Sequence, residues 1–189
     1  FPGTICASIN EEVVHGIPSA DRVLQEGDLL SVDVGVLLDG FYGDAAMSYP
    51  VGEVTPLKKR LLEVTHRSLN EAVAMLRDGT TVGDIGYTVE STVLPEGFGL
   101  VRNYAGHGIG KRLHEPPQVP NFGKRGSGVT LKENMTIAIE PMVMAGGEEV
   151  KTLADRWTVV TADGSDAAHF EKSVVIGSGG AEVLTPWEE

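Results

Sequence analysis

Alternating apolar and polar positions predict a β-hairpin in the first quarter of the chain. The segment 29–36 (LLSVDVGV) is rich in apolar and β-branched residues, which is typical of a strand. An Asp-Gly pair at 39–40 is a strong turn signal, and the chain returns over 41–48. We therefore expect two antiparallel strands joined by a two-residue loop.

Helical spacing of apolar residues appears next. It predicts an amphipathic helix over 56–76 and a second, weaker one over 82–93. The remaining expectations are a Gly- and Pro-rich loop at 103–118 and strands at 135–143 and 169–176. Because hairpins are mixed with helices, the pattern favours the α+β class.

An internal repeat relates the two halves of the chain, with its copies 107 positions apart. The first copy reads LQE at 24–26 and SVD at 31–33, and the second reads LKE at 131–133 and AIE at 138–140. Gly-containing turns at 39–40 and 146–147 keep this offset, and the tripeptide His-Gly-Ile occurs upstream of the acid in each half. We expect a duplicated unit with approximate two-fold symmetry, in which each copy has an acid on a strand, a Gly turn and a returning strand.

Two acids of the first hairpin are expected to lie close together. A two-residue loop pairs Asp44 with Gly35, which makes Asp33 and Asp44 diagonal neighbours with α-carbons roughly 7–8 Å apart. Buried like charges repel each other, and no Lys or Arg occurs between positions 29 and 50. A bound cation is the simplest compensation, with a solvated hairpin face as the plain alternative.

The second half repeats this pattern. Glu140 and Glu171 stand in apolar strand-like segments, where an unpaired charge is unusual. With a His from the loop at 103–118, the four acids make five candidate metal ligands. Two divalent cations would neutralise four carboxylates, and oxygen ligands with one imidazole suit Mn, Fe, Co or Zn, with Mg as a further option. Such a pair activates water for hydrolysis, and His15 and His114 are candidates for hydrogen-bonding the substrate or the oxyanion.

The length, net charge and cysteine content of the chain exclude or disfavour several classes of function. A length of 189 residues predicts one domain, and a net charge of -12 disfavours nucleic acids and anionic membranes as partners. No apolar run approaches the roughly 20 residues of a membrane-spanning helix. The single cysteine, Cys6, excludes a disulfide framework and a Cys-rich zinc site, and it lacks a neighbouring base that would make it a nucleophile. We assign structural roles to His66 and His169.

Several motifs, in order along nearly the whole chain, carry a family resemblance. They are INEEVVHGIP at 9–18, VDV at 32–34, DGFYGD at 39–44, GHGIG at 106–110, HEPP at 114–117, IEPM at 139–142, WTV at 157–159 and HFE at 169–171. Together these motifs resemble the type I methionine aminopeptidases. The resemblance implies the pita-bread fold, an α+β architecture in which a pseudo-two-fold antiparallel sheet is covered by helices, in agreement with the internal repeat.

The resemblance also implies roles for individual residues. The positions that match the metal ligands of the family are Asp33, Asp44, His107, Glu140 and Glu171. Of these, Asp44 and Glu171 would bridge two metals, and Glu140 would take the proton from the attacking water. The positions that match substrate contacts are His15, His114, Phe1, Cys6 and Trp157, with His15 and His114 acting beside Glu140 in catalysis. Leu113 differs from the Phe found in many relatives, which alters the shape expected of the pocket.

The implied activity is removal of the initiator methionine from nascent proteins, by attack of a dimetal-activated hydroxide on the first peptide bond. We expect residues 1–189 to form a single metallopeptidase domain, with the N-terminal extension of the family lying outside this chain. We further expect a cytoplasmic monomer that acts on N-terminal methionine peptides and nascent chains and binds neither nucleic acid nor membranes.

Two alternatives remain. One is an Xaa-Pro aminopeptidase or prolidase-type dimetal peptidase, which the short chain and the GHGIG and HEPP motifs disfavour. The other is a non-catalytic pita-bread domain that only binds peptides, which the presence of all five ligand positions disfavours.

Overall fold

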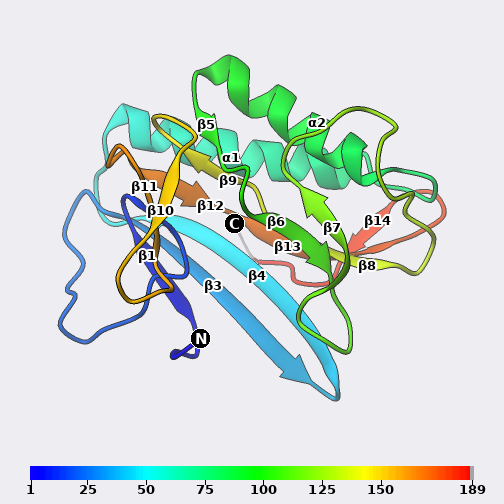
Figure 1. The fold of residues 1–189 in the computed structure, drawn as a ribbon, viewed down its shortest axis with the longest axis horizontal. Helices are drawn as coiled ribbons and strands as arrows, with labels where there is room; N and C mark the ends of the chain where they lie inside the picture. Colours follow the sequence, from blue (N-terminus) through cyan, green and yellow to red (C-terminus); the bar gives the residue numbers. More distant parts are fainter. Residues whose placement is uncertain (188–189) are drawn as a thin grey trace.

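A curved antiparallel sheet forms the centre of the molecule, and two helices cover one of its faces (Figure 1). The computed structural model describes residues 1–187. The order of strands in the large sheet is β1-β3-β4-β13-β8-β6-β7, and β14 also pairs with β13. These strands span Cys6–Ile9 (β1), Leu29–Leu38 (β3), Phe41–Pro50 (β4), Ala105–Gly108 (β6), Glu115–Pro120 (β7), Thr136–Ile139 (β8), Glu171–Ile176 (β13) and Ala181–Val183 (β14).

Two small three-stranded sheets complete the β structure, with the orders β10-β11-β2 and β12-β9-β5. Their strands span Glu12–Val14 (β2), Gly99–Leu100 (β5), Met142–Met144 (β9), Val150–Thr152 (β10), Val159–Thr161 (β11) and Ala167–His169 (β12).

The order of strands is nearly symmetric about the contact between β4 and β13. On one side of this contact β4 is followed by β3 and β1, and on the other side β13 is followed by β8 and β6. The first three strands come from the N-terminal half of the chain and the others from the C-terminal half. This arrangement confirms the predicted α+β pita-bread architecture and its approximate two-fold symmetry.

The β3–β4 hairpin forms as its sequence predicts. Asp39 and Gly40 both have positive φ values, 50° and 84°, which a two-residue turn matched to the twist of the strands requires. The register places Asp44 opposite Gly35 and Asp33 opposite Ala46. The two acids are therefore diagonal neighbours on one face, as expected.

Both helices begin at side-chain caps. Helix α1 (Pro56–Ala74) follows Thr55, whose hydroxyl accepts a hydrogen bond from Lys58 N, and it ends two residues before its predicted end. Helix α2 (Val82–Val93) has its predicted bounds and starts with a capping box between Thr81 and Asp84. A short 3-10 helix, Leu94–Glu96, follows.

The main core lies between these helices and the sheet. Its fully buried members include Leu61 and Leu69 of α1, Ile85 of α2, and Ile137 and Ile139 of β8. Within residues 1–187, no helix combines the length and the hydropathy needed to cross a membrane.

The loop predicted at 103–118 is wrong in part: residues 109–114 connect two strands, but the segment also contributes β6 and the beginning of β7. Its glycines permit close backbone approach rather than marking an irregular loop. A Cβ on Gly106 would lie 2.3 Å from the carbonyl oxygen of Ala138, and one on Gly108 would lie 2.2 Å from that of Pro116. Both values are far below van der Waals contact, so only glycine lets β6 sit between its neighbours.

Each long strand predicted in the second half is interrupted. The first divides into β8 and β9 at Glu140-Pro141, because Pro141 has no N–H to continue a ladder. The second begins at β13, while His169 belongs to β12, and Phe170 separates the two. The predicted second hairpin is also wrong: β9 pairs with β5 and β12, whereas β10 pairs with β11.

Candidate metal centre and substrate pocket

The predicted acids converge where the two halves of the large sheet meet. Asp33 lies on β3, Asp44 on β4 and Glu171 at the first residue of β13, and Glu171 faces Ala46 of β4 across the central contact. Glu140 occupies the break between β8 and β9. Three adjacent strands and one strand end thus bring together acids that are up to 138 positions apart (33 and 171).

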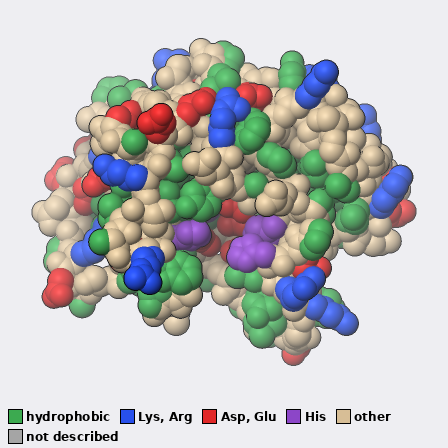
Figure 2. Space-filling model, viewed as in Figure 1, with side chains coloured by type: hydrophobic (Ala, Val, Ile, Leu, Met, Phe, Trp, Pro, Cys, Tyr) green, Lys and Arg blue, Asp and Glu red, His purple; other side chains and the backbone are tan. Residues whose placement is uncertain are grey.

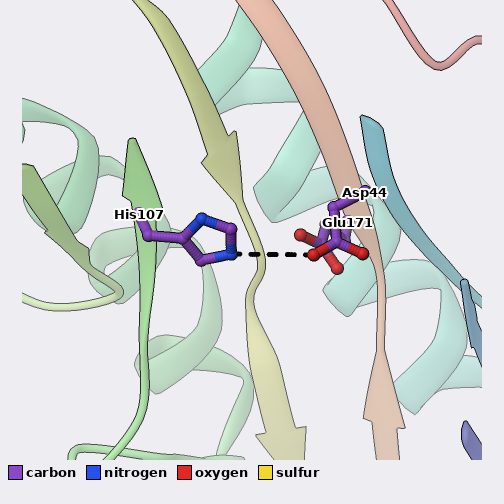
Figure 3. A group of neighbouring side chains, drawn as sticks. All are labelled: Asp44, His107 and Glu171. Carbon is purple, nitrogen blue, oxygen red and sulfur yellow. Dashed lines mark ion pairs between the residues drawn. The ribbon is translucent and has the colours of Figure 1, made fainter. Parts of the chain in front are cut away.

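His107 completes the cluster from β6. The potential metal-ligand atoms of Asp44, His107 and Glu171 all lie within 4.8 Å of one another, and all three residues are buried. In Figure 3 the imidazole of His107 points directly at the two carboxylates. Its Nε2 is 3.7 Å from Asp44 Oδ2 and 3.6 Å from Glu140 Oε1.

The tautomer of His107 follows from its backbone contact. Nδ1 lies 2.9 Å from the carbonyl oxygen of Gly108, which can only accept, so Nδ1 donates. Burial is the main cause that lowers the pKa of His107. The ring is therefore neutral near pH 7 and presents the lone pair of Nε2 to the carboxylates, which is the form that binds a metal.

Burial and mutual repulsion disfavour ionisation of the clustered carboxyl groups. Burial, followed by the charge of Asp44, raises the pKa of Asp33 to about 7. Burial and then the neighbouring acids raise the pKa values of Glu140 and Glu171 well above the usual range. In the described part of the chain, no Lys or Arg is among the causes of these shifts. Lys172, next to Glu171, instead donates to Asn70 and lies over the ring of Trp187.

A cavity of about 330 Å³ adjoins the carboxylates. The predicted substrate contacts that line it are Phe1, Cys6, His15, His114 and Trp157, together with Leu113. Phe1 packs edge-on against Trp157 at 5.4 Å between ring centroids, and His15 lies 6.4 Å from Trp157 in the same manner. Figure 2 shows His side chains around this recess with acidic side chains at its centre. The structure thus gathers every predicted site residue in one place, and their individual roles stay predictions.

His169, to which the sequence analysis assigns a structural role, also lies against the acid cluster. Its side chain is buried, and Nε2 lies 3.8 Å from Glu140 Oε2. Burial, with a smaller contribution from His15, lowers its pKa to about 3, so the ring is neutral. The available signal was its position two residues before Glu171, which puts both side chains on one face of an extended segment.

A family model covers most of the chain. The model described as metallopeptidase family M24 matches residues 1–178. The chain belongs to metallopeptidase family M24.

Individual relatives narrow this assignment. Methionine aminopeptidase 1 of Bacillus subtilis is 49% identical over 185 residues, which cover 98% of this chain and 74% of that protein. The methionine aminopeptidase of Escherichia coli K12 is 44% identical over 98% of this chain and 70% of its own length. The crystal structure of methionine aminopeptidase from Thermotoga maritima superposes with a TM-score of 0.95 at 49% identity, over 97% of this chain and 74% of that one. Within family M24, the chain thus groups with the methionine aminopeptidases.

Membership in a metallopeptidase family implies a divalent metal, and the residues present fit one. Glu171 Oε1 is buried and has no hydrogen-bond partner within residues 1–187. A buried carboxylate oxygen without a partner is expensive unless a cation occupies its open side. The donors are carboxylate oxygens and one neutral imidazole, a set that suits borderline divalent ions.

Proposed function

We propose that this chain removes the initiator methionine from newly made polypeptides by hydrolysing the first peptide bond. The observation that carries the proposal is the buried cluster of acids and His107, opening into an apolar cavity, in a chain 44–50% identical to methionine aminopeptidases. The cluster of acids and His107 would supply the hydrolytic chemistry. The cavity would supply selectivity for a methionine at the N-terminus of the substrate.

Asp33, Asp44, His107, Glu140 and Glu171 would hold two divalent cations. The count is supported by charge, since four carboxylates need two divalent ions for neutrality. When bound, such cations lower the pKa of water and polarise a carbonyl group. Mn, Fe, Co and Zn all suit this donor set.

Glu140 is the proposed general base. Its carboxylate stands between two neutral imidazoles, with Oε1 3.6 Å from His107 Nε2 and Oε2 3.8 Å from His169 Nε2. Burial raises its pKa, so it holds a proton more readily than a solvated carboxylate. We propose that Glu140 takes a proton from the attacking water and delivers it to the leaving amine.

His15 and His114 are proposed to orient the substrate. Both line the cavity beside the acids, and His114 packs against His107 with ring centroids 4.3 Å apart. Burial lowers the pKa of His15, which keeps it a neutral ring with one N–H to donate. Hydrogen bonds from these rings would stabilise negative charge that develops on the scissile carbonyl oxygen.

Phe1, Cys6 and Trp157 are proposed to receive the methionine side chain. A thioether packs favourably against aromatic edges. Burial, followed by the charge of Asp33, raises the pKa of Cys6 to about 12, so the thiol stays protonated and lines the cavity without a charge.

The test compares peptides that separate the candidate activities. Full-length protein loaded with Mn²⁺ should cleave Met-Ala-Ser much faster than Ala-Pro peptides. Asp44→Ala should abolish turnover, and Asp21→Ala, at an exposed position, should not change it. Preference for the proline peptides would instead support a prolidase, whose known structures share the fold: that of Pyrococcus furiosus superposes with a TM-score of 0.77 at 23% identity. Peptide binding without any turnover would support a binding domain.

A further inference from the structure

One buried amide, that of Asn121, contacts the backbone of a proposed ligand. Asn121 directly follows β7 and is 0% exposed. Its Nδ2 donates a hydrogen bond of 2.9 Å to the carbonyl oxygen of Glu140. Its Oδ1 is buried and has no hydrogen-bond partner among the described residues. Among the described residues, the side chain of Asn121 is therefore held by a hydrogen bond only at its NH₂ group.

This hydrogen bond stands where a strand ladder stops. Strand β6 pairs with β8 at His107↔Ala138 and Gly108↔Ile137, and the pairing ends before it reaches Glu140. The next residue, Pro141, has no N–H and cannot extend the ladder. A carbonyl group in such a gap lacks a backbone donor. The primary amide of Asn121 takes the place of the missing N–H.

The direction of the Glu140 carboxylate depends on this backbone. Within residues 1–187, neither of its oxygens takes part in a hydrogen bond, and its contacts with His107 and His169 are longer than 3.5 Å. No hydrogen bond of the side chain itself therefore orients the carboxylate when the cation is absent. The direction in which the side chain leaves the backbone depends on the peptide plane between Glu140 and Pro141. The amide of Asn121 holds the carbonyl group of that plane.

We propose that Asn121 is a positioning residue for Glu140, and that its hydrogen bond keeps the carboxylate oriented for binding a cation beside His107. The inference rests on the ligand role of Glu140 in the proposed function. Groups that orient metal ligands through hydrogen bonds typically change metal affinity or activity by about 10–100-fold when removed.

Two substitutions of Asn121 distinguish positioning of the Glu140 carboxylate from a simple electrostatic effect of the side chain at position 121 on cation binding. Asn121→Leu keeps the volume but removes the donor, and Asn121→Asp keeps the shape and, when ionised at alkaline pH, replaces the donor with an acceptor. An added negative charge near a cation site would by itself strengthen cation binding. Positioning predicts the opposite sign, because an ionised Asp repels the carbonyl oxygen of Glu140. Both variants should therefore bind Mn²⁺ at least tenfold more weakly than the wild type, measured by calorimetry on the metal-free, full-length protein.

Thr161→Val is the matched control. Thr161 is 1% exposed, and its hydroxyl donates to the backbone carbonyl of Ser165 at 2.8 Å, so the variant loses the same kind of buried bond outside the site. It should keep wild-type Mn²⁺ affinity. In turnover of Met-Ala-Ser, the Asn121 variants should lose at least tenfold in kcat, with KM changed less than threefold.

Mn²⁺ affinity of a folded Asn121→Leu protein within threefold of wild type would overturn the proposal, as would tighter binding by Asn121→Asp. If Asn121→Leu does not fold, the direction of the change in Mn²⁺ affinity of Asn121→Asp decides whether the proposal stands. If the wild type cleaves no methionine peptide while both variants bind Mn²⁺ more weakly, the proposed function fails and the positioning role stands.

Discussion

Replacing Asp33 by Asn should stabilise the metal-free protein at alkaline pH. The folded state raises the pKa of this carboxyl to about 7 from 3.8, mainly through burial. Well below pH 3.8 the group is protonated in both the folded and the unfolded chain, and it has no effect on stability. As the pH rises from about 4 to about 7, the unfolded chain releases this proton while the folded state still retains it, so wild-type stability falls over that range and levels off above it.

The size of the effect follows from the shift. A change from 3.8 to about 7 is about three pKa units, and one unit corresponds to about 1.4 kcal/mol. Ionised Asp33 therefore destabilises the metal-free fold by up to about 4 kcal/mol at pH 8. Part of this free energy is repulsion from Asp44, which adjusts its own ionisation in the wild type. The Asp33→Asn substitution should therefore raise the free energy of unfolding by about 2–4 kcal/mol.

Urea unfolding in the presence of a chelator at pH 4.5, 6 and 8 measures this. The variant should be more stable than the wild type at pH 8, and the difference should shrink to about a quarter at pH 4.5, which lies just above the unfolded pKa of 3.8. Asp28→Asn is the matched control with the opposite sign. Hydrogen bonds from Gln25 N and then Asn10 lower the pKa of Asp28, so its ionised form stabilises the fold and the substitution should weaken it.

Adding Mn²⁺ should reverse the order of the two proteins. A ligand present at 1,000 times its Kd stabilises a folded protein by about 4.1 kcal/mol, which matches or exceeds the advantage of the variant, and only the wild type retains the complete donor set. If the Asp33→Asn variant unfolds at the same or a lower urea concentration than the wild type in chelator at pH 8, the carboxyl does not destabilise the metal-free fold. The electrostatic account of the site would then be wrong.

Three further predictions concern the pocket, the sheet and the pH dependence of metal binding. Trp157→Ala should raise KM for methionine peptides about tenfold with little change in kcat, because the thioether loses an aromatic wall; an unchanged KM in steady-state assays would contradict the assigned pocket. Gly106→Ala should lower the unfolding temperature by several degrees or prevent folding, since its Cβ would lie 2.3 Å from a carbonyl oxygen of β8. Gly179→Ala, where a Cβ meets only open space, should have little effect. Mn²⁺ binding should release protons and weaken as the pH falls from 8 to 6, because burial raises the pKa values of Glu140 and Glu171. Equal calorimetric enthalpies in buffers of different ionisation heat would contradict the proton release.

Elements encoded by local signals were predictable from the sequence. The Asp39-Gly40 turn determines the register of β3 and β4, and with it the diagonal placement of Asp33 and Asp44. The caps at Thr55 and Thr81 similarly mark the beginning of each helix. In each case the residues that decide the structure lie within a few positions of one another.

Features that depend on distant partners were not predictable in this way. The apolar run around Glu140 looks like one strand, yet β8 pairs with β13 and β9 with β12, so its two parts belong to different sheets. The glycines of β6 look like loop residues until β8 is placed beside them. Local patterning does not encode these choices, because the sheet that a segment joins depends on strands far away in the sequence.

The site shows the same division. A charge inside an apolar segment is visible locally, and this suffices to select Asp33, Asp44, Glu140 and Glu171 as candidates. Asn121 carries no such mark, because its importance comes from one contact with a backbone carbonyl 19 positions away.

The contact between β4 and β13 has a consequence for how the protein holds together. Among residues 1–187, only Glu171↔Ala46 and Lys172↔Ala45 form the ladder there, so few backbone bonds join the two halves of the large sheet. Asp44 and Glu171 lie on opposite sides of this junction, and an ion bound by both would act as a cross-link between the halves. Loading the site should therefore slow amide hydrogen exchange along β4 and β13 more than in α2, so that the same ions that enable hydrolysis also fasten the two repeats to each other.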